Sequence, residues 1–310
     1  MQQKPIDSTP LVVGLGQCSI DVIGTVDEFP GPDEKTELNN LRIQGGGPVA
    51  TALVTLARWG IRTALIGVVG DDPFGDFIRI DLAGEGIDLS TLVRAPSVRS
   101  QFALVVAETG TGNRNIFWDR GVQAPPGLGS LDLSMIPRAS CLHLDGLMAE
   151  ASIAAARLAG AHGVPVMYDG GTLRDGSIEL ACLSDYLVVS HKFSIQYLSA
   201  DDPDRAAREL AGLGPAMVTV TLGAGGSVTF TKDGTFTQRA LEIDAVDTTG
   251  AGDVFHGALI YGILQGWDAA TSIRTATAAA GLKCLEPGGR AGIPTFEKAL
   301  KAAAGIEGPS

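Results

Sequence analysis

Along this 310-residue chain, short apolar runs alternate with stretches whose apolar residues recur at the spacing of a helix. This alternation constrains the fold more than any other feature. Stretches such as "VATALVTLARWG" separate many of the runs and usually end on glycine, as helices with a left-handed C-terminal cap do. Apolar strands joined by helices are typical of a parallel sheet with both faces covered. We therefore predict an α/β fold whose central, mostly parallel sheet is flanked by helices. The expected strands lie within residues 11–16, 63–70, 102–108, 141–146, 164–170, 186–190 and 216–223.

Two segments break this rhythm, residues 24–44 and residues 97–121. Both contain many turn residues and have the extended pattern of hairpins rather than that of strand–helix units. They fit a small β-sheet that stands outside the main sheet and serves as a lid over a cleft. Because no repeat, low-complexity tract or linker interrupts the sequence, we expect one domain over residues 1–310.

The formal charge of −12 argues against a nucleic-acid partner, because neutralising phosphates requires a basic face. The first residues lack a basic segment followed by a sustained apolar stretch, and no apolar run reaches the roughly 20 residues of a membrane span. Neither a secretion signal nor a membrane anchor is expected. The four cysteines have neither CxxC spacing nor the density of a disulfide framework. We expect free, buried thiols and a cytoplasmic location.

The segment "VDTTGAGDVFHGAL", residues 246–259, crowds glycines into the first turn of an expected helix. Glycine in a helix interior costs about 1 kcal/mol relative to alanine. Backbone N–H groups in a first helical turn have no internal partners and carry partial positive charge, and glycines let an anion approach them. The sequence therefore indicates an anion site at the N–H groups of Gly250, Ala251 and Gly252.

Asp253 follows this turn directly, where its carboxylate would face a bound anion. That arrangement is unfavourable unless the carboxylate is a base that takes a proton from an attacking hydroxyl. Glycine N–H groups that hold developing charge, beside an aspartate that activates an alcohol, are typical of phosphoryl transfer. The alternative is that Asp253 only complements the helix dipole, while Asp247 or Thr249 caps the helix.

The run "DTTGAGD" before an apolar helix resembles the C-terminal signature of the ribokinase-like carbohydrate kinases, the PfkB family. "GGGPVATALVTLARWG" (45–60) and "GVVGDDPFG" (67–75) resemble the family's N-terminal glycine-rich signature, and "VTVTLGAGGS" (218–227) resembles its nucleotide loop. "AAAGLKCLEPGGRAGIP" (278–294) resembles the tail beside the adenine and phosphate pockets. "HGAL" together with "KCLEPGGRAGIP" is most similar to a branch that includes sulfofructose kinases and, more distantly, ketohexokinases.

The resemblance implies a ribokinase-like fold and transfer of the γ-phosphoryl group of ATP to a hydroxymethyl group of a sugar, assisted by Mg²⁺. It assigns Asp253 as the base, the backbone of Gly250–Gly252 as the anion hole and Asp21 as the acceptor of sugar hydroxyls. It further assigns substrate binding to Gly46, Gly47, Thr51 and Arg114, and nucleotide binding to Ser190, Thr221, Gly223, Gly225 and Gly226. A homodimer formed through lid strands and a monovalent cation are the remaining expectations.

The chain departs from the family pattern at positions that bear on the chemistry. Thr51 stands where the family usually has asparagine, and its hydroxyl can still bind a sugar. Phe193 stands where the family's Asn-x-x-Glu element, tied to Mg²⁺ and phosphate, has its glutamate, and Ser190 takes the place of the asparagine. Asp169, at the end of "VPVMYD", is the substitute carboxylate that we assign to the metal, through water. The alternative is that Asp169 is a turn residue at the end of a strand.

Other functions have weaker support in the sequence. "GLGQCS" (14–19) nearly matches GxGxxG, but Ser19 replaces the third glycine and β-prone chain follows, which disfavours dinucleotide binding. The histidines have no metal-ligand spacing, and His256 is assigned to packing or the surface rather than to substrate. The leading hypothesis is a sugar or nucleoside kinase. A catalytically weak sugar-sensing protein of the same fold, which the loss of the glutamate at Phe193 favours, and a dehydrogenase are the alternatives.

Overall fold

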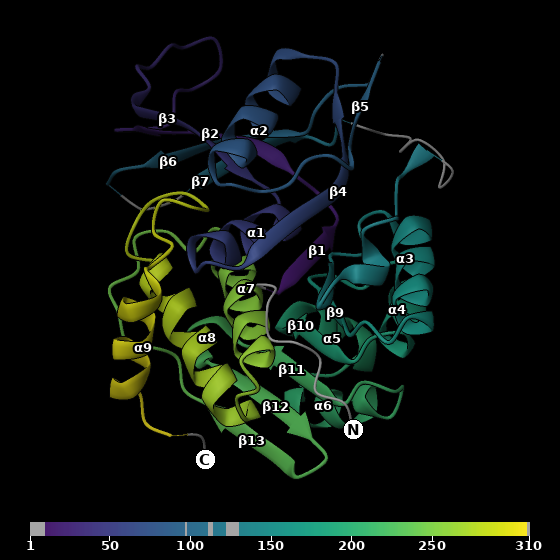
Figure 1. Ribbon diagram of the computed structural model, residues 1–310. Coiled ribbons are helices and arrows are strands. Elements are labelled where there is room, and N and C mark those ends of the chain that lie inside the picture. The colour runs from purple at the N-terminus through teal and green to yellow at the C-terminus, as the bar shows by residue number, and fades with distance from the viewer. Residues whose placement is uncertain (1–9, 97, 111–113, 122–129, 309–310) are drawn as a thin grey trace.

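The computed structural model describes residues 10–96, 98–110, 114–121 and 130–308, whose strands form two sheets (Figure 1). The larger sheet has the strand order β13-β12-β11-β10-β9-β8-β1-β4-β5. Its strands are β1 (Leu11–Leu15), β4 (Arg62–Gly70), β5 (Leu92–Ala95), β8 (Cys141–Leu144), β9 (Val166–Gly170), β10 (Tyr186–Ser190), β11 (Met217–Thr221), β12 (Ser227–Thr231) and β13 (Gly234–Gln238). The smaller sheet, with the order β3-β2-β6-β7, consists of β2 (Ser19–Val26), β3 (Asn39–Gly46), β6 (Phe102–Glu108) and β7 (Arg114–Asp119).

Helices cover both faces of the larger sheet. They are α1 (Pro48–Arg58), α2 (Pro73–Gly84), α3 (Ala149–Ala161), α4 (Ser177–Cys182), α5 (His191–Leu198), α6 (Pro203–Ala211), α7 (Ala251–Leu264), α8 (Ala269–Lys283) and α9 (Phe296–Gly305). Figure 1 shows α7, α8 and α9 together on one side of the molecule and α3 and α4 on the other. Among the described residues no helix has the length and apolar character needed to cross a bilayer.

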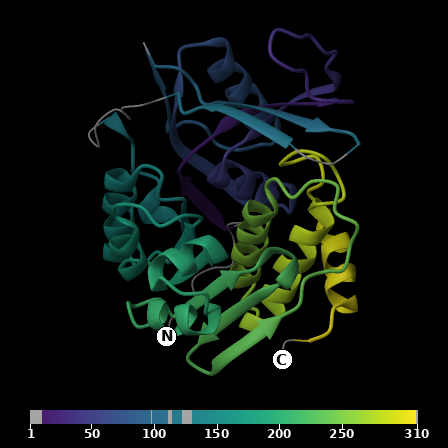
Figure 2. The same ribbon diagram turned by 180° about the vertical axis from the view of Figure 1, so that it is seen from behind.

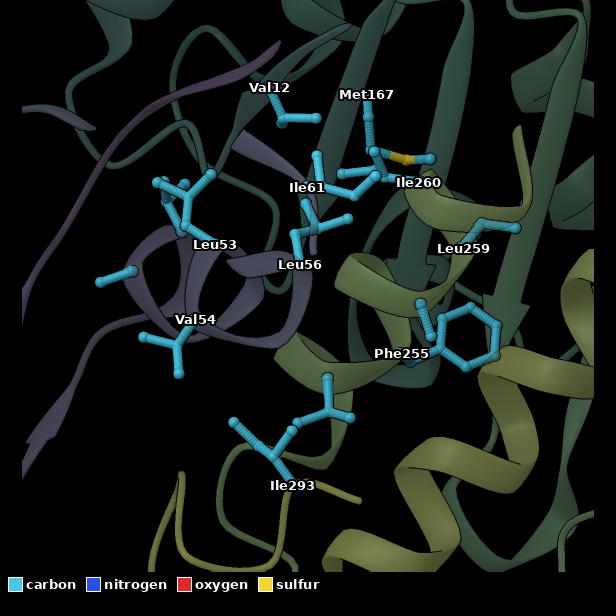
Figure 3. Packing of buried hydrophobic residues seen from close by; sticks show 14 of the residues in the cluster. Val12, Leu53, Val54, Leu56, Ile61, Met167, Phe255, Leu259, Ile260 and Ile293 are labelled. Atoms are coloured by element: carbon cyan, nitrogen blue, oxygen red, sulfur yellow. The ribbon is translucent and has the colours of Figure 1, made fainter. Parts of the chain in front are cut away.

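Alternate residues of the central strands enter two separate cores. Val12 and Met167 pack in the cluster that faces α1 and α7, whereas Val13 and Tyr168 pack in the cluster that faces α3 to α6. Figure 3 shows the first of these cores, with Val12 and Met167 beside side chains of α1 and α7. This division explains why the strands are apolar throughout. The predicted fold class, a mostly parallel sheet flanked by helices, is confirmed.

The sheet differs from the prediction at one edge, where β12 and β13 form an antiparallel hairpin beside β11. The turn contains Asp233-Gly234, with Gly234 at φ 126°, and an Asp-Gly pair between β-prone runs is a hairpin signal that the prediction overlooked. The cysteines differ as well. Cys18, Cys141 and Cys284 are buried free thiols as expected, but Cys182 is a free thiol exposed at the last residue of α4.

The smaller sheet lies at one end of the molecule, together with α2, in both views (Figures 1 and 2). It begins earlier than predicted, because β2 starts at Ser19 rather than near residue 24 and β3 continues to Gly46. The run 102–108 is a strand as predicted, and β6 pairs in the smaller sheet to which residues 97–121 were assigned, parallel to β2 and antiparallel to β7. Asp21 is consequently a residue of the smaller sheet.

The position of β1 determines where a ligand can bind. In the larger sheet, β4 and β5 lie on one side of β1, and β8, β9, β10 and β11 lie in sequence order on its other side. In such open α/β sheets, ligands bind beyond the carboxyl ends of the strands at the point where the strand order reverses. That point lies beyond β1 and β8, where Gly16, Gln17 and Asp145 follow the two strands.

Candidate active site

The loop before α7 and the first turn of α7 have the geometry of an anion site. Gly250 precedes the helix with φ 76°, and a β-carbon there would lie 2.6 Å from the carbonyl oxygen of Gly289. Only glycine therefore fits at this position without strain. A β-carbon on Gly252 would meet no atom within 4 Å, so the space in front of this turn is open. The N–H groups of Gly250, Ala251 and Gly252 lie at the start of a 14-residue helix, where the helix dipole adds positive charge, and that of Ala251 donates to the Thr248 carbonyl oxygen at 3.2 Å.

Three carboxyl groups gather beside this turn, each at the end of a different element. Asp145 follows β8, Asp169 is the penultimate residue of β9, and Asp253 lies in the first turn of α7. Burial and then the charge of Asp169 raise the pKa of Asp253 to about 7. Burial raises the pKa of Asp169 to about 7 and that of Asp145 to about 6. Perturbed acids gathered at the ends of strands mark a candidate active site.

The backbone holds Asp145 in place. Its Oδ2 accepts a hydrogen bond from the N–H of Gln17 at 2.7 Å, and its Oδ1 accepts one from the N–H of Leu147 at 3.0 Å. The first bond spans the reversal point between β1 and β8. A β-carbon on Gly16 would lie 2.4 Å from Oδ2 of Asp145, so glycine is required for this approach. The sequence prediction did not include Asp145, although it directly follows an apolar strand.

Two histidines, His256 and His143, are buried near Asp169 and the first turn of α7. Nδ1 of His256 lies 2.7 Å from the carbonyl oxygen of Gly252, and its Nε2 lies 3.7 Å from Oδ1 of Asp169. The His143 ring lies 5.5 Å from the His256 ring. Burial and then the neighbouring His256 lower the pKa of His143 to about 3, and burial lowers that of His256. Both rings are therefore neutral near pH 7, and His256 is buried against the first turn of α7, as its assignment to packing predicts.

Two of the residues assigned to sugar binding, Asp21 and Gly46, lie in the paired strands β2 and β3. A β-carbon on Gly46 would lie 2.5 Å from Oδ2 of Asp21, so the glycine lets this carboxyl group lie against the backbone. Gly47 has φ 95° before α1, and a β-carbon there would lie 2.4 Å from the carbonyl oxygen of Gln17. Burial raises the pKa of Asp21 to about 6, although the positive charge of Arg290 opposes this shift.

Arg290 is the largest omission from the sequence prediction. Its side chain is 5% exposed and donates hydrogen bonds to the Gly46 carbonyl oxygen at 2.8 Å and to Oδ2 of Asp81 at 2.5 Å. Its Nε also donates to Oγ1 of Thr51 at 3.3 Å. Thr51 is 1% exposed and its hydroxyl accepts this hydrogen bond, while its assignment to sugar binding stays a prediction. Arg290 stands in "PGGRAGIP", and a lone arginine between glycines could have drawn attention to it.

A cavity of about 650 Å³ lies between the smaller sheet and the carboxyl ends of the central strands. Gln101, Trp118 and Arg120 line it from the side of the smaller sheet, and Asp145 and Asp169 line it from the larger sheet. Neither Asp253 nor Asp21 is among the described residues that line this cavity. Asp253 lies beside the anion site, and Asp21 lies near Arg290. Arg114 begins β7, and its side chain lies outside the described residues.

The residues assigned to the nucleotide follow two neighbouring strands. Ser190 and Thr221 are register partners at the ends of β10 and β11, and Oγ1 of Thr221 donates to the Val189 carbonyl oxygen at 3.3 Å. The loop after β11 uses glycines with positive φ, 58° at Gly223 and 86° at Gly226. A β-carbon on Gly223 would meet nothing within 4 Å, whereas one on Gly226 would lie 2.0 Å from the Gln238 carbonyl oxygen. A β-carbon on Gly225, between them, would lie 3.2 Å from the Leu222 side chain.

Phe193 has a structural role that explains the missing glutamate. Its side chain is fully buried in the core that faces α3 to α6, and a β-carbon on Gly170 would lie 3.2 Å from its ring. Oγ of Ser190 accepts a hydrogen bond from the N–H of Phe193 at 3.1 Å and donates one to the Gly171 carbonyl oxygen at 2.8 Å. The Ser-x-x-Phe element therefore caps α5 and fills the core, and supplies no carboxylate.

A metal ion would have to be held mainly by other groups. In the described part of the chain, no three His, Cys, Asp or Glu side chains form a metal site. Mg²⁺ is commonly bound by one or two carboxylates together with substrate phosphates and water. Asp169 fits this requirement, because it lines the cavity and its side chain is 13% exposed.

Comparison with known proteins agrees with this geometry. The chain is 29% identical over 298 residues to the ATP-dependent ribose-1-phosphate kinase of Halopiger xanaduensis, a match that covers 92% of this chain and 95% of that protein. It is 27% identical over 296 residues to a nucleoside kinase of Methanothermobacter thermautotrophicus, covering 94% of each. Its fold matches the crystal structure of the ribokinase of Thermotoga maritima with a TM-score of 0.84, at 24% identity and over 95% of this chain and 99% of that one.

The family model for pfkB family carbohydrate kinases matches residues 9–296. This match confirms the resemblance inferred from the motifs and the enzyme class, a phosphotransferase with an alcohol group as acceptor. The narrower similarity to sulfofructose kinases and ketohexokinases stays a prediction. The chain belongs to the pfkB family of carbohydrate kinases.

Proposed function

We propose that the protein transfers the γ-phosphoryl group of ATP to a hydroxymethyl group of a sugar. The observation that carries this proposal is the first turn of α7, where Asp253 stands beside glycine N–H groups whose front is open. The cavity of about 650 Å³ next to it has room for a sugar and part of a nucleotide. The similarity to an ATP-dependent kinase over most of both chains supports ATP as the donor.

In the proposed reaction, Asp253 accepts the proton of the sugar hydroxyl as the hydroxyl oxygen attacks the γ-phosphorus, and the bond from that phosphorus to the β,γ-bridging oxygen breaks to release ADP. A pKa of about 7 suits this role, because a base with a pKa near the working pH combines adequate basicity with a large deprotonated fraction. The N–H groups of Gly250, Ala251 and Gly252 stabilise the charge on the transferred group. Asp21, held against Gly46, accepts hydrogen bonds from other sugar hydroxyls and so orients the one that reacts.

The nucleotide is assigned to the loop Gly223–Gly226 and to the ends of β10 and β11, where Gly223 leaves open space. Mg²⁺, if bound, would supply charge neutralisation for the phosphates. Asp169 is the residue of this chain that would hold it, directly or through water.

A nucleoside acceptor is the second candidate. Trp118 lines the cavity and is 53% exposed, and the guanidinium of Arg120 lies 4.9 Å from its ring centroid. An exposed indole on a cavity wall offers a flat apolar surface on which a base can stack. The similarity to a nucleoside kinase supports this alternative.

A homodimer formed through the smaller sheet completes the proposal. The register places Ile43, Val22, Leu104 and Phe117 side by side across its strands, on one face. Ile43 is 51% exposed and Phe117 is 61% exposed, and a row of apolar side chains across an exposed sheet favours a partner. Phe117→Ser should convert the dimer to a monomer in light scattering. The free thiols fit a reducing compartment such as the cytoplasm.

The decisive experiment measures ATP consumption with a panel of ketoses, aldoses, sugar phosphates and nucleosides, and identifies the phosphorylated product. Turnover with a sugar, abolished in Asp253→Asn, supports the sugar kinase. Turnover with nucleosides alone favours the second candidate. Stabilisation by a sugar without ATP turnover supports a sensor, and reduction of a nicotinamide cofactor supports a dehydrogenase. Either of the last two outcomes contradicts the proposal.

A further inference from the structure

Lys283, the last residue of α8, is buried with no exposed surface. Burying an ammonium group is costly unless the group is paired or hydrogen-bonded. Its Nζ donates a hydrogen bond of 2.7 Å to the carbonyl oxygen of Asp247. Asp247 begins the "DTTGAGD" run, three residues before Gly250. A buried positive charge therefore binds directly to the loop that leads into the anion site.

Asp247 joins this loop to the segment that follows α8. Its Oδ1 accepts hydrogen bonds from the N–H of Thr249 at 2.9 Å and from Oγ1 of Thr249 at 2.7 Å. Its Oδ2 accepts one from the N–H of Gly288 at 2.7 Å. Burial favours the neutral form of Asp247, but these N–H donors and the charge of Lys283 outweigh it, and the pKa lies below its ordinary value. The carboxylate is ionised and holds both segments.

The resemblance to the PfkB family raised a monovalent cation as an expected cofactor. Such ions bind where carbonyl and carboxylate oxygens converge. Oxygens of this kind do converge between the two segments, but N–H donors of the protein already bind them. The N–H groups of Val246 and Asp247 donate to the Cys284 carbonyl oxygen at 2.8 and 3.1 Å, and Lys283 Nζ donates to the Asp247 carbonyl oxygen. These oxygens do not fit a further cation, because the Lys283 ammonium occupies that place.

We propose that Lys283 is a positioning residue whose ammonium group is a built-in cation, which holds the 247–250 loop and with it the anion hole. On this proposal, which rests on the proposed kinase function, the protein needs no monovalent cation from solution. Gly250 lies between Asp247 and the helix, against Gly289. Displacement of Asp247 would therefore move the first N–H groups of α7 away from the position in which they bind the anion.

The test compares the parent protein with Lys283→Ala, Lys283→Met and Lys283→Arg, and with Lys301→Met as an exposed control. Each protein is measured in KCl, NH₄Cl and choline chloride at constant ionic strength. The melting temperature and kcat of the parent and the control should be the same in all three salts. Lys283→Ala should lose about 10²-fold in kcat in choline, the effect of misplacing reacting groups by about 1 Å.

The proposal further expects K⁺ or NH₄⁺ to raise the melting temperature of Lys283→Ala saturably, and to restore part of its kcat, because the substitution leaves a cation-sized space among oxygens. Lys283→Met fills that space and should respond little, while Lys283→Arg should stay independent of added cations. A saturable rise in melting temperature or kcat of the parent with K⁺ overturns the proposal, even if every Lys283 variant fails to fold. Parent-like kcat in Lys283→Met also overturns it. The melting temperatures decide between these outcomes even if the protein is not a kinase.

Discussion

Asp169 and Gly252 are joined through one imidazole ring: Nε2 of His256 lies 3.7 Å from Oδ1 of Asp169, and Nδ1 lies 2.7 Å from the Gly252 carbonyl oxygen. Because a carbonyl only accepts, Nδ1 carries the proton in the neutral ring and Nε2 presents a lone pair to Asp169. No donor within hydrogen-bond distance meets that lone pair in the described structure. Asp169 therefore lies close to the first turn of α7, where its charge raises the pKa of Asp253.

This relationship predicts the pH dependence of turnover. Asp253 acts as a base only when deprotonated, so kcat/KM should fall as the pH drops through about 7, the value to which burial and Asp169 raise its pKa. Asp169→Asn removes the neighbouring charge, and the acid limb should move to lower pH. Asp175→Asn, at an exposed position, is the control and should leave the profile unchanged. An acid limb that stays in place in Asp169→Asn would show that the two carboxyl groups do not interact.

Asp253→Asn should leave ATP binding intact and lower kcat by roughly 10²–10⁴-fold, because an amide cannot accept the hydroxyl proton. Calorimetric titration of ATP and steady-state kinetics measure the two effects. Turnover within a few-fold of the parent would contradict the assignment of the base.

The same substitution should change how stability depends on pH. The raised pKa means that the folded protein holds a proton that the unfolded chain releases near pH 4. Stability from this group is therefore fully present at low pH and falls as the pH rises from about 4 to about 7. Asp253→Asn removes this loss, so its melting temperature relative to the parent should be higher at pH 8 than at pH 5. An equal difference at the two pH values would show that the carboxyl group is not buried as described.

Gly252→Val should reduce kcat more than it raises the sugar KM, because the branched side chain would enter the space where the phosphoryl group approaches the helix. A β-carbon at this position meets no protein atom, so stability should stay within about 1 kcal/mol of the parent. Gly250→Val is the matched comparison. It should lower the melting temperature, because position 250 has φ 76° and faces the Gly289 carbonyl oxygen. Loss of sugar affinity with kcat retained would show that the two sites are reversed.

Asp21→Ala should raise the sugar KM by roughly 10²-fold if about 3 kcal/mol of charge-assisted hydrogen bonding is lost, with the KM for ATP nearly unchanged. Gly46→Ala should act in the same direction, because its methyl group would displace Oδ2 of Asp21. Initial rates with each substrate varied give both constants. If Asp21 only supports its strand, the melting temperature falls and both KM values stay as they were.

The sequence predicted the architecture because its signals are local. Strands such as β1 and β10 are apolar on both faces, and Gly250 and Gly252 indicate a helix whose first backbone N–H groups are open to a ligand. The turn residues around 102–108 placed this strand in the smaller sheet correctly, but its parallel pairing with β2 could not be predicted, because the partner of a strand is not a local property. The hairpin β12–β13 was missed although its Asp-Gly turn was visible.

The candidate site shows the same division. The motif around Asp253 was recognisable from seven consecutive residues, whereas Arg290 reaches Gly46 across 244 positions of the chain. No spacing rule connects such residues. Thr51 was assigned by its place in a motif, but a helix position does not reveal that a distant arginine takes its hydroxyl. Lys283 and Asp145 became visible only through burial and the backbone groups that they meet.

The bonds of Arg290 to Gly46, Thr51 and Asp81 also set an order of events during synthesis. A chain emerges from the ribosome N-terminus first, and its early segments can begin to fold before the rest exists. The loop at Gly46 is made early, but the guanidinium that holds it is added only near the end of translation. A chain that stops before residue 290 therefore contains the strands of both sheets in its sequence but lacks the guanidinium that binds Gly46, Thr51 and Asp81.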